Sequence, residues 1–350
     1  MGEGETTVKF IRYPKIGQFR NLIEGLILHL TYAGKDETGE PIYEKDRELE
    51  AIKFKGTCKL HGTNAGIVFK NDDIWFQKRK SVVTPKNDNF GFATFYSNSE
   101  RLERLKELRD RIRKHFGIPE NYTLAVFGEW AGLKIQNGVG ISQLPKAFYL
   151  FGIKTSFAEE VKWYPCEGFR DHNINIFNVE DYETHEITLD LRHPELVQEK
   201  LLEITERVEK ECPISKAFGI ENGLGEGIVW KAFVKGDLHC FKVKGDKHAS
   251  VKGGKKEKVA ILPAKLASIV EFVDYAVTNS RLEQAYHELF TANNIKPTKK
   301  HTGEMIKWIR NDVAEEELDV LTESELTLKD IGGTLAGLTK DWFFAKVDMF

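Results

Sequence analysis

The hydrophobic pattern of the chain changes once, close to Lys244. Before this point, short runs rich in Val, Ile, Phe, Trp and Tyr are separated by Gly, Asn or Asp, which is typical of strands. After about residue 254, apolar residues recur with helical spacing. The connecting segment, 244–258, is basic, contains glycine and is poor in apolar residues. We therefore predict an α+β fold, with an antiparallel-sheet domain over residues 1–252 and a small all-α domain over 253–350.

The periodicity also places individual elements. The expected strands cover residues 52–59, 65–70, 73–78, 123–130, 147–154, 227–233 and 238–244. One helix is expected over 99–117, with Ser99 as its N-cap and Gly117 at its end. A second is expected over 193–213, with Leu196, Leu201, Ile204 and Val208 on one face and Pro213 as its end. The C-terminal helices are expected over 263–277, 280–295, 302–317 and 334–347.

Composition narrows the class of protein. A chain of 350 residues with 41% hydrophobic and 30% charged residues is expected to be soluble and globular. Its apolar runs are too short to span a membrane, and its acidic N-terminus has no apolar signal region, so we expect a cytoplasmic protein. The four cysteines form no C-x-x-C pair and are interpreted as reduced intracellular thiols, without a structural zinc site.

Charge is informative locally rather than globally. The net charge of −3 does not indicate nucleic acid binding, but nine lysines face only three acidic residues between Lys231 and Lys258. Such a cluster can form an anion-binding surface that the overall sum conceals. The alternative is a solvated lysine-rich loop.

The segment "CKLHGTN", residues 58–64, raises a chemical question about Lys59. A lysine attacks covalently only as a neutral amine, and because the reference pKa is about 10.4, burial or nearby cations must favour that form. Gly62 would allow close backbone approach, while His61 and Asn64 would supply hydrogen bonds. The alternative is an exposed lysine in an ordinary turn.

Five later positions support the first interpretation. Glu129 ends an apolar strand, and Glu226 precedes another strand that carries Lys231. Lys242 and Lys244 have strand spacing and therefore lie on one face. Two lysines on one strand face need either solvent or an anion, and a nucleotide is such an anion.

The order K-x-H-G, F-G-E, E-G-x-V-x-K, K-x-K resembles the covalent nucleotidyltransferase superfamily of polynucleotide ligases and mRNA capping enzymes. Within it, the chain resembles the RNA ligase 2 family of phage-type enzymes. Residues 59–64 are similar to its nucleophile motif, with His61 where DNA ligases have Asp. Residues 77–81 are similar to its next basic motif, 127–136 to its third, and 148–153 to the segment with an adenine-stacking aromatic. The helical C-terminal part resembles this branch too.

The resemblance implies three steps. Lys59 attacks the α-phosphate of ATP and becomes lysyl-AMP, AMP passes to an RNA 5′-phosphate, and a 3′-OH then forms the phosphodiester. Glu226 would hold Mg²⁺ or Mn²⁺, Glu129 would accept a ribose hydroxyl, and Phe151 would stack on adenine. Lys242 and Lys244 would clamp the α-phosphate and favour the neutral amine of Lys59. The complete implied ATP site is Cys58, Leu60, His61, Asn64, Arg79, Glu129, Phe151, Glu226, Lys231, Lys242 and Lys244.

Two positions depart from the family pattern. Cys58 and Gly152 stand where the family has acidic residues, so adenine contact at residue 58 would rest on the backbone.

The resemblance implies an ATP-dependent RNA ligase that seals breaks in duplex RNA, acts as a monomer, and works in the cytoplasm, or in the host cytoplasm for a viral enzyme. The alternatives are a DNA ligase or capping-type nucleotidyltransferase, and a catalytically inactive RNA-binding module of the same fold.

Overall fold

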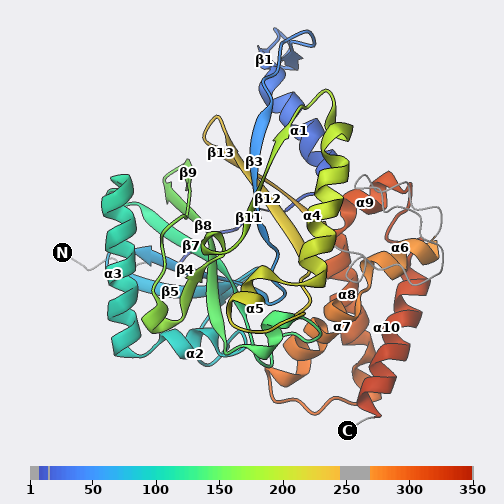
Figure 1. Cartoon of the computed structure of the whole chain (residues 1–350). Coiled ribbons are helices and arrows are strands. Elements are labelled where there is room, and N and C mark those ends of the chain that lie inside the picture. Colours follow the sequence, from blue (N-terminus) through green and yellow to red (C-terminus); the bar gives the residue numbers. More distant parts are fainter. Residues whose placement is uncertain (1–7, 15, 245–268, 349–350) are drawn as a thin grey trace. The chain divides into compact units, whose positions relative to one another are not determined.

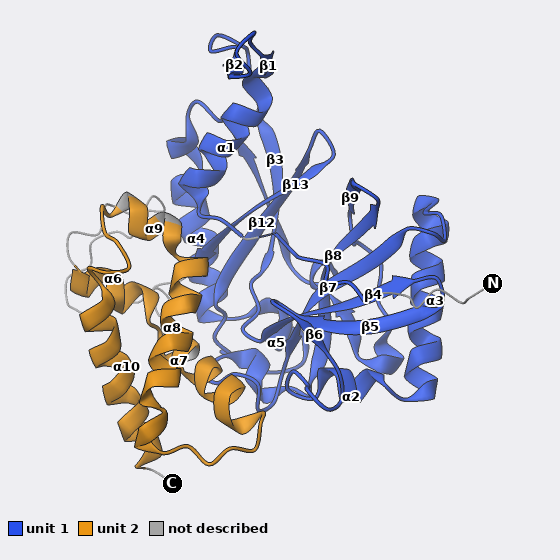
Figure 2. Cartoon of the chain, turned by 180° about the vertical axis from the view of Figure 1, so that it is seen from behind, with its two compact units in different colours: residues 1–245 blue, residues 246–350 orange. Residues whose placement is uncertain are grey.

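The computed structural model describes residues 8–14, 16–244 and 269–348 (Figure 1). The chain divides into two compact units, residues 1–245 and 246–350 (Figure 2). The expected boundary between residues 252 and 253 lies outside the described residues, as does the basic segment beyond Lys244.

The larger sheet of the first unit has seven strands. Six follow the order β10–β8–β7–β4–β5–β6, and β9 pairs with β8. All of these pairings are antiparallel except β10 with β8. The bounds are β4 Thr63–Lys70, β5 Asp73–Lys78, β6 Val82–Val83, β7 Thr123–Ala131, β8 Ala147–Phe157, β9 Glu160–Tyr164 and β10 Ile176–Asn178.

One face of this sheet is buried under helices α2 (Phe92–Tyr96) and α3 (Ser99–Phe116). Alternation along β4 turns Ala65, Ile67 and Phe69 into this core, where Leu105 and Leu108 of α3 also lie. The same alternation places Asn64, the register partner of Glu129, on the opposite face. Farther along that face, Val68 and Phe127 are buried together with Ile11 of the N-terminal segment.

The smaller sheet has four antiparallel strands in the order β11–β3–β12–β13. Their bounds are β3 Ile52–Cys58, β11 Thr184–Leu189, β12 Gly227–Val234 and β13 Asp237–Lys244. Phe54, Trp230 and Phe241 pack together on one face, where Phe19 of helix α1 (Phe19–Thr31) meets Phe241. Because side chains alternate, the lysines of these strands lie on the other face. They are Lys53, Lys55, Lys231, Lys242 and Lys244.

Shorter elements complete the first unit. The strands β1 Tyr32–Lys35 and β2 Pro41–Tyr43 form a separate two-stranded sheet. Helix α4 spans Gln198–Lys210 and α5 spans Pro213–Ala217. Short 3₁₀ turns span Gly140–Gln143, His172–Ile174, Val179–Asp181 and Pro194–Val197.

The helix predictions for this unit are correct in part. Asn98, not Ser99, caps α3, because its side chain accepts the Arg101 backbone N–H; Gly117 ends the helix with φ 64° as predicted. The prediction for 193–213 is wrong at both ends. Leu196 lies in a 3₁₀ turn and is 73% exposed, so it leaves the apolar face, and Pro213 begins α5 rather than ending α4.

The second unit is helical in its described part, as predicted. Its helices are α6 Ile269–Ala276, α7 Asn279–Tyr286, α8 Thr302–Glu316, α9 Leu318–Glu323 and α10 Gly332–Val347, with a π turn at His287–Thr291 and a 3₁₀ turn at Lys299–His301. Phe272, Ile309 and Phe343 lie in its core. The predicted α+β fold is thus confirmed. Across the described ranges, every helix is too short or too polar to cross a membrane.

Candidate active site

The turn at residues 59–62 connects β3 of the smaller sheet to β4 of the larger one. The Lys59 backbone N–H donates to the Gly227 carbonyl at 2.8 Å, which fixes the turn to the start of β12. Gly62 packs directly on β7: a Cβ there would lie 2.5 Å from the Trp130 carbonyl oxygen. This close approach excludes any larger residue, so the glycine positions the turn against the larger sheet.

The side chain of Lys59 lies beside Glu226. Lys59 Nζ is 2.6 Å from Glu226 Oε2, His61 Nδ1 is 3.4 Å from the same oxygen, and Lys244 Nζ is 3.4 Å from Glu226 Oε1. Glu226 is only 5% exposed, whereas Lys59 is 20% and Lys244 34% exposed. Three predicted site residues, two from this turn and one from β13, therefore meet on one buried carboxylate.

Electrostatics keep that carboxylate ionised. Burial alone would raise the pKa of Glu226, but the charges of Lys59 and Lys244 and a hydrogen bond from His61 bring the pKa well below its ordinary value. The group is thus an anion held among cations. Such an oxygen donor suits a hard divalent ion.

Glu129 approaches the same turn from β7. Its Oε1 accepts the Gly62 backbone N–H at 3.0 Å. Burial raises the pKa of Glu129 to about 7; nearby Glu226 adds to the increase, and Lys59, Gly62 and Arg79 oppose it. Arg79 itself is exposed just beyond β5 and close enough to act on Glu129. The predicted Glu129 and Arg79 thus share the electrostatic environment of Lys59.

Phe151 and Lys231 form a second group. Lys231 Nζ donates to the Phe151 carbonyl at 2.6 Å and lies 5.1 Å from the centre of its ring. Tyr13, from the N-terminal segment, meets Phe151 edge to face at 5.0 Å. The predicted stacking aromatic is therefore in contact with a cation and a second ring.

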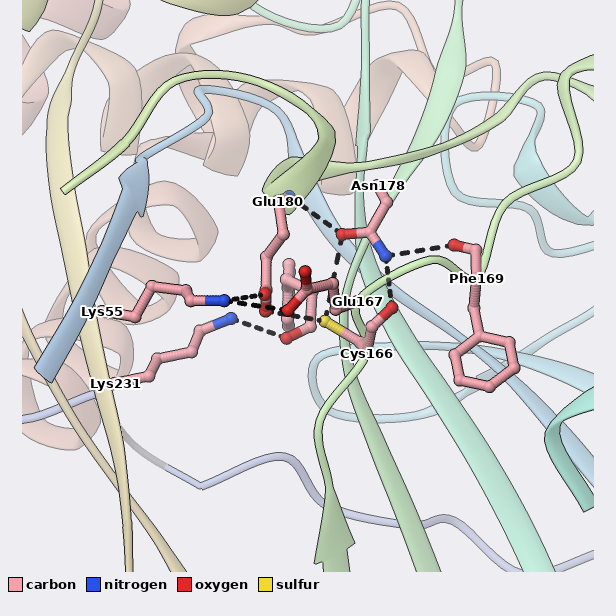
Figure 3. A network of polar contacts seen from close by, with 8 residues as sticks. Lys55, Cys166, Glu167, Phe169, Asn178, Glu180 and Lys231 are labelled. Atoms are coloured by element: carbon pink, nitrogen blue, oxygen red, sulfur yellow. Dashed lines mark hydrogen bonds and ion pairs between the residues drawn. The ribbon is translucent and has the colours of Figure 1, made fainter. Parts of the chain in front are cut away.

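Next to this pair lies a polar network that sequence reasoning missed (Figure 3). Lys55 Nζ contacts Glu180 at 2.9 Å and Glu167 at 3.1 Å, and Cys166 Sγ donates to Glu180 at 3.3 Å. The sequence could have indicated Lys55, because it lies four residues before Lys59 in the strand expected over residues 52–59 and so shares the face of Lys59. Glu167 and Glu180 had none, since only the tertiary fold brings them to Lys55.

Three other predicted residues lie at or near the turn. Cys58 belongs to the opposite face of β3, where it pairs with Ile228 and its thiol lies 3.5 Å from Cys212. Leu60 is buried. Lys242 shares the face of Lys244 on β13, and its backbone N–H donates to Gly17 at 3.4 Å.

In the region that the structure describes, no group of three or more His, Cys, Asp or Glu residues could hold a metal ion. Glu226, ionised and buried, is the donor nearest to Lys59. This fits an ion held by one protein carboxylate together with water and substrate phosphates, the usual arrangement for Mg²⁺ in phosphoryl transfer.

The fold and the site are those of a two-sheet protein with a lysine–carboxylate cluster where the sheets join. A family model for RNA ligases matches residues 53–244, more than half of the chain, and includes every residue of this cluster. The chain therefore belongs to the RNA ligase family, and the resemblance stated from its motifs is confirmed.

Solved structures of a Naegleria gruberi RNA ligase also match. The ligase with PPi is 17% identical, with 68% of this chain and 57% of that chain covered and a TM-score of 0.38. A lysine-to-alanine variant with ATP and Mn is 16% identical, with the same coverage and a TM-score of 0.38. A glutamate-to-alanine variant with ATP and Mn is 17% identical, also with 68% and 57% covered, and a TM-score of 0.37. The match thus spans little more than half the length of those proteins.

Proposed function

We propose that this protein is an ATP-dependent RNA ligase that joins 3′-OH and 5′-phosphate RNA ends, and that Lys59 carries AMP. The observation that carries the proposal is the contact of Lys59 with Glu226, shared by His61 and Lys244, in a chain of the RNA ligase family. The cofactors proposed here are ATP and Mg²⁺ or Mn²⁺.

In the first step, the Lys59 nitrogen forms a bond to the α-phosphorus of ATP, the bond to pyrophosphate breaks, and the amine loses a proton. AMP then moves to the 5′-phosphate of RNA, with cleavage of the N–P bond. Finally, the 3′-OH attacks this activated phosphate, a phosphodiester forms and AMP leaves.

The chain supplies charge and position for these steps. Lys244 contacts the same carboxylate as Lys59, so the site places two cations side by side for the phosphates of ATP. Lys242, on the same strand face, adds positive charge for the α-phosphate. Glu129 accepts a ribose hydroxyl through the carboxylate that also holds Gly62.

Glu226 is the residue that would hold the divalent ion, directly or through water. When bound, the ion neutralises charge on the phosphates of ATP. Lys231 and Phe151 would enclose the base, and Lys55 would support them through its ion pairs with Glu167 and Glu180.

The test is transfer of label from ATP to protein. Protein freed of bound AMP is incubated with α-labelled ATP or GTP and Mg²⁺, then run on a denaturing gel. We expect label from ATP and not from GTP, and no label with Lys59→Ala. Lys53→Ala is the matched control, since Lys53 is an exposed lysine on the same strand, and should be labelled like wild type.

The polymer is identified in a second assay. Nicked duplex RNA and nicked duplex DNA with the same sequence are offered to the adenylylated protein. Sealing of RNA alone supports the proposal, and sealing of DNA makes the protein a DNA ligase. Label from GTP identifies a capping-type enzyme, and absence of label leaves the inactive RNA-binding module.

A further inference from the structure

Two buried cysteines lie in contact directly behind the proposed nucleophile. Cys58 Sγ and Cys212 Sγ are 3.5 Å apart, and the residues are 3% and 2% exposed. All four cysteines lie among the described residues and are free thiols. The fold brings the sulfur atoms of Cys58 and Cys212 into contact. Cys58 ends β3, one residue before Lys59, whereas Cys212 lies 154 positions later, just before α5.

The two cysteines are connected to the segments that carry Lys59 and Glu226. Cys58 Sγ lies 3.8 Å from the Lys59 carbonyl oxygen. On the other side, the Cys212 backbone N–H donates to Gly223 at 2.7 Å, three residues before Glu226. The Lys59 N–H in turn donates to Gly227. A bond between the sulfurs would therefore join β3, which leads to Lys59, to the residue that is hydrogen-bonded to the loop before Glu226.

We propose that Cys58 and Cys212 form a reversible disulfide, and that this bond slows the reaction of Lys59 with ATP. The effect on ATP rests on the proposed function, but the formation of the bond does not. A disulfide needs a sulfur separation of about 2.05 Å, so the atoms must approach by about 1.5 Å. A displacement of about 1 Å at a reacting group can cost about 100-fold in rate, so we expect a decrease of about 10-fold to 100-fold.

The chemistry balances with a peroxide as oxidant. The Cys212 sulfur attacks hydrogen peroxide, the O–O bond breaks, and sulfenic acid and water result. The Cys58 thiol then attacks that sulfur, the S–O bond breaks, and the disulfide and a second water form. The pKa of Cys212 is lowered, first by a hydrogen bond from Cys58 and then by contacts with Ser215 and Ile214 that outweigh burial, which makes Cys212 the better first nucleophile.

The experiment uses the full chain, reduced and then treated with hydrogen peroxide. Digestion without reductant followed by mass spectrometry should find the peptides of residues 58 and 212 joined, with the loss of two hydrogen atoms. The rate of labelling by α-labelled ATP should decrease as this species accumulates and recover with dithiothreitol.

Two variants assign the effect. Cys212→Ser should be labelled at the rate of reduced wild type and should keep that rate in peroxide. The double variant with Cys166→Ser and Cys240→Ser should lose activity in peroxide by the same factor as wild type. Absence of the joined peptide overturns the proposal, as does an unchanged rate in the joined protein. If reduced wild type takes no label, the proposed function fails, while the peptide map still decides whether the bond forms.

Discussion

Replacement of Glu129 by Gln tests whether ionisation of this buried carboxyl group lowers the unfolding free energy as pH rises. Burial raises the pKa of Glu129 from 4.5 to about 7. When the pKa of a carboxyl group is higher in the folded state than in the unfolded state, the protonated group stabilises the folded state relative to the ionised one. Its contribution is complete below the unfolded-state pKa, decreases as pH rises toward the folded-state pKa, and is lost above it.

The magnitude follows from the size of the shift. A change from 4.5 to about 7, at about 1.4 kcal/mol per unit, corresponds to about 3 kcal/mol. Because the residue is only partly buried, solvent screening reduces this estimate, and we expect about 1.5–3 kcal/mol. Wild type should lose this amount of unfolding free energy through Glu129 between about pH 4.5 and about pH 7.

Other groups titrate in the same range, so the measurement is a difference between two proteins. Burial lowers the pKa of His185 and of His239, and their contributions grow as pH rises, which opposes the effect of Glu129. Glu129→Gln removes only the carboxylate and keeps an oxygen that can accept the Gly62 N–H. The difference in unfolding free energy between variant and wild type should therefore shift in favour of the variant as pH rises.

Urea unfolding followed by circular dichroism at several pH values provides the free energies. The control is Glu186→Gln, because Glu186 is exposed on β11, and it should keep the pH dependence of wild type. If Glu129→Gln and wild type show parallel pH profiles, the carboxylate is not destabilised by burial and the reasoning is refuted.

Three further predictions concern other parts of the chain. Arg281→Met should destabilise the helical unit by about 3–5 kcal/mol, since the buried Asp312 and Glu317 would lose the guanidinium that pairs with both of them. Thermal unfolding measures this against the exposed Arg310→Ala, expected within about 0.5 kcal/mol. Gly62→Ala should reduce lysyl-AMP formation about 100-fold, because the added Cβ would displace the turn. The control is Gly25→Ala in α1, where the added Cβ has open space; it should increase the unfolding free energy in urea by about 0.5–1 kcal/mol. Lys244→Ala removes a cation from Glu226 and should raise the pKa of that carboxyl group. The lysyl-AMP yield of this variant should fall at least 10-fold. The control is Lys235→Ala, at an exposed position beyond β12, and its lysyl-AMP yield should match that of wild type.

Much of the site could be predicted because each of its segments carries its own local signal. Alternation along residues 52–59 and 238–244 determines which lysines share a face, and Gly62 indicates a close backbone contact. The sequence could not supply the pairing of β12 with β3, which brings Glu226 to Lys59. That register depends on contacts between residues more than 150 positions apart.

The errors have equally physical causes. Leu196 has the spacing of an apolar helix face, but the 3₁₀ turn that begins at Pro194 rotates it into solvent. Helix α1 was not predicted, and its Phe19 is fixed by the aromatic contact with Phe241. Cys212 has no motif at all, and only the fold places its sulfur against Cys58.

The position of the turn explains why so many charges meet there. Residues 59–62 are the covalent link from the smaller sheet to the larger one, so each sheet contributes one carboxylate: Glu226 comes from the loop before β12 and Glu129 from β7. Glu226 is ionised by its cations, whereas burial brings the pKa of Glu129 to about 7. The two acidic groups therefore differ in charge near neutral pH because Lys59 and Lys244 contact one and not the other.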